Sequence, residues 1–529
     1  QGWDDGHAAP LLYTRWPMET LTGNTGVVVR QEVFAHTPGG GPVRSGKEPL
    51  YLWVRFRVET VDPIEAPAAA TMMVHIGDPA QMQRSMWHEQ NLTVHPRRAT
   101  YPRPLTRDSY AIGELSHARL VEPDGRIRLT AMTAAGSAML IERDAGSRDY
   151  FLQVSMPAAK DARVDLVLPM IPGDPAEVRA EADLGFDAAL AQADAYWSQR
   201  PATAAVVDTP EPHVNRAVRR MVEIARVTSE TNPDNGDRAL LTGSWNYDTL
   251  WPTPTCMASH MLLDLLGWHE FTADNLEIFR TYQGATKPPG VAYEKHPGYF
   301  GAPQQLSSID WLTDHGSILH SVALHALLTD DEAFVARWTE PILKACAFLK
   351  DARAQANHDG VKGILPPAVA TDTGIPAQAV WNDAWNYKGL ETAARFLRRI
   401  NHPAADEYAA EAVAYKEAFQ KAYREAAAKS PTWTDDAGRT RLAVPSVVSG
   451  PDLRTHPFYL DTGPLVLAWA GLLDGDDPLM QDALAFFREG PYQKLYDPRG
   501  DMHQRPVLVH EISSCEPCYS FNILASWRT

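Results

Sequence analysis

Carboxylates and large aromatic side chains occur together in three short segments of this 529-residue chain. The segments cover residues 243–252, residues 380–387 with the stretch before them, and residues 510–520. A carboxylate can accept hydrogen bonds from two hydroxyl groups while an indole packs on C–H groups, and this combination suits a pyranose. Two carboxylates could also cleave an acetal, because one can protonate the leaving oxygen while the other activates water.

The composition limits the class of protein and the kind of partner. The chain carries 66 acidic and 49 basic side chains, a net charge of −17 and four cysteines. The acidic balance argues against a surface for nucleic acid or anionic membranes, and four cysteines exclude a disulfide scaffold. No apolar run approaches the roughly 18 residues that a membrane span needs. We expect a soluble globular protein of one large or two medium domains, and its 15 tryptophans indicate a partner with flat faces.

The first third of the chain has the pattern of an antiparallel β-sandwich. Short apolar or alternating runs are separated mostly by Gly, Pro and Asp, with no helical pattern between them. These runs cover residues 26–30, 50–58, 71–76, 126–130, 150–154 and 164–168. We expect a β-sandwich domain over residues 1–180 and a linker helix within residues 181–210, where a helical pattern covers 183–200.

Residues 211–529 repeat with a period of 3.6 and predict a helical domain. Tyr408, Ala412, Tyr415 and Phe419, for example, fall on one helical face. The expected outer helices cover residues 213–230, 270–285, 331–356, 404–428 and 477–489, and the expected inner helices cover 255–266, 314–328, 384–400, 462–473 and 512–527. Pro341 should kink or interrupt the third outer helix.

Short and long connections alternate along this helical domain. The short turns are expected at residues 267–268, 329–331, 401–403 and 475–478, and the long segments at 232–254, 286–313, 357–383, 429–460 and 490–511. Helices joined by short turns form antiparallel hairpins, so the long segments must all emerge at one end of the array. Loops of that length are usually functional, and we expect the site at that end.

Helix hairpins that follow a β-sandwich in this way resemble the six-hairpin glycosidase superfamily, which includes glucoamylases, disaccharide phosphorylases and α-L-rhamnosidases. The resemblance covers most of the chain in architecture but only short motifs in sequence. It implies a multidomain β + α protein, with an antiparallel β-sandwich followed by an (α/α)6-type helical toroid. Because six hairpins need twelve helices and the pattern supplies about ten, the resemblance also implies a chain that is cut short at its C-terminal end.

The same resemblance implies a glycoside hydrolase that is inverting and exo-acting on an oligo- or polysaccharide. In the segment 243–252, which is similar to the entry into the first inner helix of these enzymes, Trp245 and Asp248 would hold the sugar. Tyr247 and Trp251 would line the same subsite. On the residues alone, Asp248 could instead simply cap a helix.

The catalytic carboxylates are assigned by the resemblance as two alternatives each. The run 380–387 is similar to the helix start that follows the general acid in disaccharide phosphorylases, which indicates Asp372 as the acid, with Asp383 as the rival. The late segment 510–520 would supply the base, with Glu511 ahead of Glu516. The acid must keep its proton near neutral pH, so its pKa must be raised by a partly desolvated, aromatic-lined pocket.

Further long-loop side chains are candidates for binding the substrate. They are Trp311, Asp314, His315, Trp381 and Trp385. The pair Cys515 and Cys518 has the spacing of a zinc or redox pair, but a single such pair is weak, and we expect neither a metal nor another cofactor.

Three other functions keep some support. A polysaccharide lyase would need a basic pocket, whereas these loops are acidic and aromatic. A phosphorolytic enzyme would need phosphate-binding groups, which His503, Arg505 and His510 could supply. A non-catalytic carbohydrate-binding protein would keep the aromatic residues without both carboxylates. We expect a carbohydrate as the partner and neither nucleic acid nor a membrane. The oligomeric state stays open. A first residue Gln1 and a composition typical of bacteria predict a periplasmic or secreted protein.

Overall fold

The computed structural model describes residues 1–20, 23–61, 69–76, 106–112, 115–133, 138–143, 150–232, 234–243, 249–304, 306–307, 309–370, 374–450 and 463–489. The chain divides into two compact units. The first consists of Gln1–Ala202 with Thr231–Asp237, and the second of Thr203–Glu230 with Arg238–Thr529.

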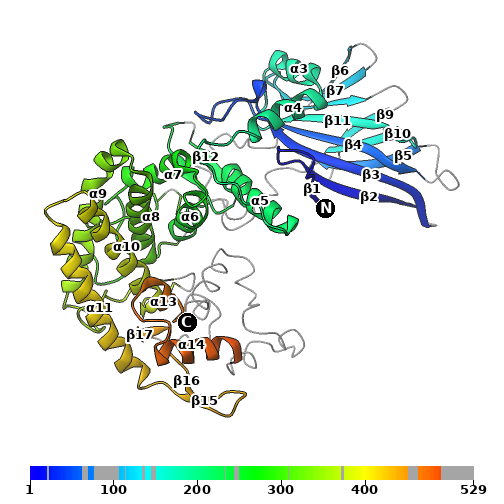
Figure 1. Ribbon diagram of the computed structural model, residues 1–529. Helices are drawn as coiled ribbons and strands as arrows, with labels where there is room; N and C mark the ends of the chain where they lie inside the picture. Colours follow the sequence, from blue (N-terminus) through cyan, green and yellow to red (C-terminus); the bar gives the residue numbers. More distant parts are fainter. Residues whose placement is uncertain are drawn as a thin grey trace. The chain divides into compact units, whose positions relative to one another are not determined.

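The first unit contains an eight-stranded and a three-stranded antiparallel sheet (Figure 1). Its strands are β1 (Gly2–Trp3), β2 (Leu12–Thr20), β3 (Gly23–His36), β4 (Tyr51–Val61), β5 (Ala69–Ile76), β6 (Thr106–Ile112), β7 (Leu115–Val121), β8 (Ile127–Thr133), β9 (Ala138–Arg143), β10 (Tyr150–Pro157) and β11 (Arg163–Pro169). The order in the large sheet is β1-β2-β3-β4-β11-β8-β7-β6, and in the small sheet β5-β10-β9. Every strand expected from the sequence overlaps one of these elements, to within one residue at its ends.

The two sheets share one hydrophobic core. Val29 and Val54 come from the large sheet and Leu152 and Val154 from the small one, and all four belong to a single buried cluster. Successive side chains of a strand point to opposite faces, which is why alternate apolar residues in the sequence reach this core. The predicted antiparallel β-region is confirmed.

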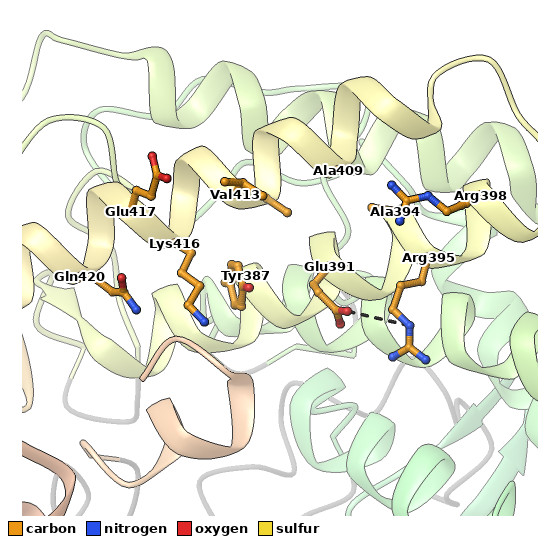
Figure 2. Close-up of a pocket in the computed structure, with 11 residues that line it drawn as sticks. Tyr387, Glu391, Ala394, Arg395, Arg398, Ala409, Val413, Lys416, Glu417 and Gln420 are labelled. Carbon is orange, nitrogen blue, oxygen red and sulfur yellow. Dashed lines mark ion pairs between the residues drawn. The ribbon is translucent and has the colours of Figure 1, made fainter. Parts of the chain in front are cut away.

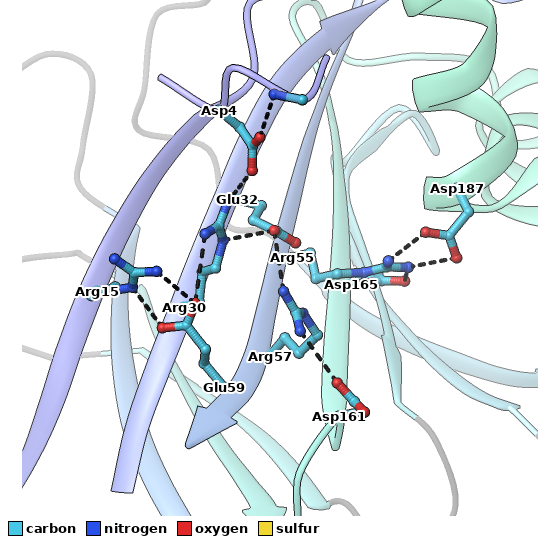
Figure 3. A network of polar contacts seen from close by, with 11 residues as sticks. Asp4, Arg15, Arg30, Glu32, Arg55, Arg57, Glu59, Asp161, Asp165 and Asp187 are labelled. Atoms are coloured by element: carbon cyan, nitrogen blue, oxygen red, sulfur yellow. Dashed lines mark hydrogen bonds and ion pairs between the residues drawn. The ribbon is translucent and has the colours of Figure 1, made fainter. Parts of the chain in front are cut away.

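The opposite face of the large sheet carries a network of charged side chains (Figure 3), beside an apolar cluster that includes Phe34 and Trp53. Arg55 on β4 donates two hydrogen bonds to Asp165 on β11, at 2.7 and 2.9 Å, and two to Asp187, at 2.6 and 3.3 Å. Its guanidinium also lies over the ring of Phe186, 3.9 Å from the centroid. Because the Arg55 side chain is only 7% exposed, these contacts hold the strand pair and the following helix together.

Two helices follow the last strand: α3 (Pro175–Leu184) and α4 (Phe186–Trp197). The helical run expected over 183–200 corresponds to α4, whereas α3 is not expected from the sequence, and Gly185, with φ +80°, separates the two helices. The helices pack on the large sheet, and Glu181 of α3 accepts hydrogen bonds from Trp53 Nε1 and His36 Nδ1, both at 2.6 Å. They belong to the first compact unit.

The second unit is mostly helical. Its helices are α5 (Pro212–Thr228), α6 (Pro252–Ala258), the π-turn η2 (Ser259–Leu263), α7 (His269–Thr281), α8 (Thr313–Thr329), α9 (Glu332–Ala354), α10 (Val380–Arg399), α11 (Ala405–Ala427), α13 (Val466–Ala470) and α14 (Pro478–Glu489). Short strands β12 (Ser229–Thr231), β13 (Arg238–Leu240), β14 (Gln378–Ala379), β15 (Thr432–Thr434), β16 (Thr440–Leu442) and β17 (Val447–Ser449) lie in the connections. No helix in the described ranges is long and apolar enough to cross a membrane.

The helices follow the expected hairpin order, with two differences. Helix α9 runs through Pro341 as one element, so the expected interruption is absent. Helix α13 covers only Val466–Ala470, much less than the expected range, and the expected helix over 512–527 lies outside the described residues.

Short turns between paired helices use residues with positive φ. Gly267 (+76°) precedes α7, Asp330 (+52°) separates α8 from α9, and Asn401 (+54°) separates α10 from α11. These are residue types that tolerate the left-handed conformation. Asp331 then caps α9 by accepting hydrogen bonds from its first free N–H groups. The turns therefore lie where the sequence places them.

The inner helices α8 and α10 approach each other through two glycines. A Cβ on Gly316 would lie 2.4 Å from the backbone nitrogen of Asn386, and one on Gly389 would lie 2.6 Å from the carbonyl oxygen of Gly316. Figure 1 shows α9 and α11 outside this inner pair. The two glycines thus bring the N-terminal parts of α8 and α10, and the loops that lead into them, close together.

Candidate functional site

Backbone hydrogen bonds join the long loops to one another. Each bond links the loop before one inner helix to the loop before the next: Leu250 N to Leu306 O (3.0 Å), Val369 N to Pro289 O (2.8 Å), Leu312 N to Val369 O (2.9 Å) and Val380 N to Ser446 O (3.0 Å). The loops therefore meet at the N-terminal ends of α6, α8, α10 and α13. The expectation that the long segments emerge together is confirmed for these described stretches.

The loop before α10 is anchored on both sides of residues 371–373. Ala368 and Ala377 exchange two hydrogen bonds of 3.0 Å each, which brings the two flanks of that segment together. The Gln378 side chain accepts from Val361 N at 2.7 Å and donates to the carbonyl oxygens of Val361 and Leu365, both at 2.8 Å. These hydrogen bonds therefore fix the residues on both sides of the segment 371–373.

Asp383 lies in the first turn of α10 and is fully buried. Its Oδ1 accepts a hydrogen bond from Tyr415 Oη of α11 at 2.7 Å and from Leu365 N at 3.3 Å. Its Oδ2 is without a partner among the described residues. Burial raises the pKa of Asp383 to about 7. The carboxyl can thus hold a proton near neutral pH, but its bonded oxygen points to an outer helix and to the loop base.

Aromatic rings pack around the ends of the inner helices. The indoles of Trp381 and Trp385 are 5.7 Å apart, and Trp385 lies 4.7 Å from Trp469 of α13. Trp251 and Trp311, from two neighbouring loops, form an edge-to-face pair at 4.8 Å. All five side chains are buried. Four of them are candidates from the sequence, and the structure adds Trp469, which the sequence pattern does not single out.

Asp314 and His315 form hydrogen bonds that hold neighbouring helices and loops together, which gives both residues a structural role. Asp314 accepts from Thr253 N and Thr253 Oγ1 through one oxygen, at 3.1 and 2.8 Å, and from Trp311 N through the other, at 3.1 Å. His315 accepts from Phe300 N at 3.0 Å and contacts the carbonyl oxygen of Ala345 at 3.2 Å. These bonds tie the starts of α6 and α8 to each other, to the loop before α8 and to α9.

Burial dominates the electrostatics of these two residues. It raises the pKa of Asp314 to about 7, although three hydrogen bonds oppose that effect. It lowers the pKa of His315 to about 3, so this imidazole is neutral. Two carboxyl groups with raised pKa, Asp314 and Asp383, thus lie at the starts of neighbouring inner helices. Such perturbed groups are typical of functional sites, although buried structural groups show the same effect.

Several sequence candidates lie outside the described residues. They are Trp245, Tyr247, Asp248, Asp372, Glu511 and Glu516. Their roles stay predictions. The structure brings Trp251, Trp311 and Asp314 together between the starts of α6 and α8, and it places Trp381 and Asp383 in the first turn of α10.

The sequence pattern misses Tyr415 and Gln378, which hold Asp383 and the loop base. Tyr415 shares the apolar face of α11 with Phe419, so the sequence marks it only as a core residue. Its hydroxyl reaches Asp383 across 32 residues of chain, and no local signal predicts that bond. Gln378 immediately precedes α10, and its position beside the 380–387 motif is the one sequence clue to its role.

A groove of about 400 Å³ runs along α10 and α11, away from the loop connections (Figure 2). Its lining includes Tyr387, Glu391, Arg395, Val413 and Lys416, with both signs of charge. None of the sequence-predicted site residues lines it, and it is a separate feature of the helical unit.

No protein-family model matches this sequence, and no curated protein matches it. A bacterial glucoamylase solved in complex with acarbose matches at a TM-score of 0.51 and 10% identity, over 87% of this chain and 66% of the glucoamylase chain. A family 78 rhamnosidase of a Bacillus species matches at 0.38 and 13%, over 84% of this chain and 38% of the rhamnosidase. A family 92 α-mannosidase of Bacteroides thetaiotaomicron matches at 0.37 and 11%, over 90% and 62%.

This chain spans about two thirds or less of the length of each of these proteins. At such low identity, the glucoamylase match is evidence of the fold alone. The β-region and the helix hairpins agree with this match, which shows that the fold of the chain is like that of the glucoamylase.

Proposed function

We propose that the protein is a glycoside hydrolase that acts on an oligo- or polysaccharide, with its helical unit forming part of an α/α toroid. The observation that carries the proposal is the meeting of the long loops at the N-terminal ends of the inner helices, beside buried tryptophans and a carboxyl with raised pKa. The likeness to a glucoamylase fold adds to it.

Asp372 is the proposed general acid. A general acid must come within hydrogen-bond reach of the leaving oxygen, and the side chain of Asp383 is 0% exposed and already bonded to Tyr415 and Leu365. Asp372 instead belongs to the short segment between Ala368 and Ala377, which is held at its base by two backbone hydrogen bonds. Asp383 then acts as a positioning residue for that loop, and it is the second candidate for the acid.

Glu511 is the proposed base, with Glu516 as the alternative. Trp245 and Asp248 are the proposed sugar-binding pair, supported by Tyr247 and Trp251. A carboxylate base that activates water, rather than attacking the sugar, makes the reaction inverting; this requires the two carboxyl groups to be roughly 6.5–9.5 Å apart in the substrate complex. Exo action on a terminal sugar is proposed from the resemblance to the six-hairpin glycosidases.

A substrate screen tests the proposal. The protein is incubated with aryl glycosides and with plant, algal and bacterial polysaccharides, with and without inorganic phosphate, and reducing sugar is measured beside the ultraviolet absorbance of unsaturated sugar. We expect release of reducing sugar from the polysaccharides without the ultraviolet absorbance of unsaturated sugar, and we expect this release not to require phosphate. Rising absorbance would replace the hydrolase with a lyase. Release of a sugar phosphate only when phosphate is present would replace it with a phosphorylase.

Variants at the two aspartates then separate their roles. Asp372→Asn should lower kcat by about 10²- to 10⁴-fold, the usual contribution of a general acid, while circular dichroism stays unchanged. Asp383→Asn should lower kcat less, because the amide oxygen can still accept from Tyr415 and Leu365. Loss of all activity in Asp383→Asn with full activity in Asp372→Asn would reverse the assignment. Glu511→Gln and Glu516→Gln form the matching pair for the base.

A further inference from the structure

Two histidines and one aspartate meet at the hairpin-turn side of the helical unit, apart from the long loops. Asp264 follows the π-turn η2, His269 opens α7, and His325 lies in the last part of α8. The Nδ1 atom of His325 is 2.9 and 3.0 Å from the two carboxylate oxygens of Asp264, and the Nδ1 atom of His269 is 3.0 Å from Oδ1. The three candidate ligand atoms all lie within 4.8 Å of one another.

The cluster is largely buried, so the negative charge of the Asp264 carboxylate needs compensation from nearby groups. The side chains of Asp264 and His325 are each 1% exposed, and that of His269 is 27% exposed. Among the described residues, the ion-pair partners of Asp264 are these two imidazoles, with no lysine or arginine beside them. A buried carboxylate is costly unless a positive charge or strong hydrogen bonds compensate it.

We propose that Asp264, His269 and His325 bind one divalent transition-metal ion, with zinc as the best-fitting class. Imidazole nitrogens and a carboxylate oxygen are the ligands that zinc and its neighbours prefer. Ligand atoms around tetrahedral zinc, with bonds of about 2.0–2.1 Å, stand roughly 3.3 Å apart. Here the two imidazoles lie 2.9–3.0 Å from the carboxylate, and all three ligand atoms lie within 4.8 Å of one another. The partial exposure of His269 gives the ion a path from solvent.

The surroundings of the cluster fix its two rings. The rings of His269 and His325 are 6.1 Å apart, and His325 also packs against Phe334 of α9, at 4.4 Å. The three ligands come from three consecutive parts of the helical unit, so a bound ion would clamp the turn between η2 and α7 to the end of α8. This site is separate from the proposed sugar site, and its test does not depend on any glycosidase activity.

The alternative arrangement is a protonated imidazole paired with the carboxylate, without a metal. The two differ in their response to pH, because a metal needs unprotonated nitrogen and its binding releases protons. They also differ in their visible spectrum after Co²⁺ is added, because only the metal-binding arrangement can hold a cobalt ion in a low-coordinate site that absorbs strongly.

The test uses the full chain after treatment with a chelator. Co²⁺ is titrated while visible absorption is recorded, Zn²⁺ is then added in competition, and the melting temperature is measured with each ion. We expect one Co²⁺ per chain, displacement by Zn²⁺, and a rise in melting temperature. His269→Ala should weaken binding by more than the 10- to 100-fold typical of losing an outer-shell group.

His213→Asn is the matched control, because His213 is an exposed histidine of the same unit. It should bind Co²⁺ as the unchanged protein does. Asp264→Asn provides a second ligand variant, and His269→Ala remains informative if that buried change prevents folding. Equal Co²⁺ binding by His269→Ala and by the unchanged protein would overturn the proposal. A visible spectrum no stronger than that of free Co²⁺ would also overturn it and would leave the protonated pair.

Discussion

Replacing Asp383 by Asn should change how the stability of the helical unit depends on pH. The substitution keeps the shape of the side chain and an oxygen that can accept hydrogen bonds from Tyr415 Oη and Leu365 N. It removes a buried carboxyl whose second oxygen has no partner among the described residues. The native protein holds the proton of Asp383 up to about pH 7, whereas the unfolded chain releases it near the ordinary value of 3.8.

The sign of the effect follows from these two values. Between about pH 4 and pH 7 the native state binds more protons than the unfolded state, so the free energy of unfolding falls as the pH rises. A pKa raised from 3.8 to about 7 corresponds to a loss of about 4 kcal/mol over that range. The asparagine of Asp383→Asn does not titrate, so this variant escapes that loss. As the pH is raised from about 4 to about 7, its free energy of unfolding should rise relative to that of the unchanged protein by up to about 4 kcal/mol.

Urea unfolding followed by tryptophan fluorescence, repeated across that pH range, measures the difference. Asp476→Asn controls for the loss of one acidic group, because Asp476 is exposed. It should leave the pH dependence of the unfolding midpoint unchanged. Parallel stability curves for Asp383→Asn and the unchanged protein would refute the reasoning, since they would mean that Asp383 is charged in the native state at every pH tested.

Two further changes test the packing of each unit. Arg55→Leu should destabilise the β-unit by about 3–5 kcal/mol, because it leaves the carboxylate of Asp165 without its buried partner, and thermal unfolding of the full chain would detect the loss. Gly316→Ala should lower the melting temperature of the helical unit or prevent its folding, because the added Cβ would lie 2.4 Å from the backbone of Asn386. Gly41→Ala, where no atom lies within 4 Å of the added Cβ, should have little effect in the same measurement.

The periodicity of the sequence determined the order and type of the elements. Alternation of apolar residues in runs such as 50–58 predicted strands, since a strand places successive side chains on opposite faces. The 3.6-residue period predicted the helices, and residues such as Asp330 and Asn401, which tolerate positive φ, marked the turns between them. These signals are local, and the described structure bears them out.

One local expectation gave way to tertiary packing, and one helix was missed. Pro341 is expected to kink or interrupt a helix, yet α9 continues through it as one element, with buried residues on both sides such as Trp338 and Ile342. Burial of these apolar side chains outweighs the local preference of proline. The expected helical run 183–200 corresponds to α4, which begins after Gly185, whereas α3 begins within the region expected to be the β-sandwich.

The position of the long loops could be inferred from sequence because alternating short and long connections leave little choice of topology. The partners of individual side chains could not. Tyr415 meets Asp383, and His325 meets Asp264, only because neighbouring helices pack side by side and bring together residues that are 32 and 61 positions apart. The sequence determined which carboxylates and aromatic residues the loops carry, whereas the tertiary structure decided which of them are buried and bonded, because burial and hydrogen bonding depend on neighbours distant in the chain.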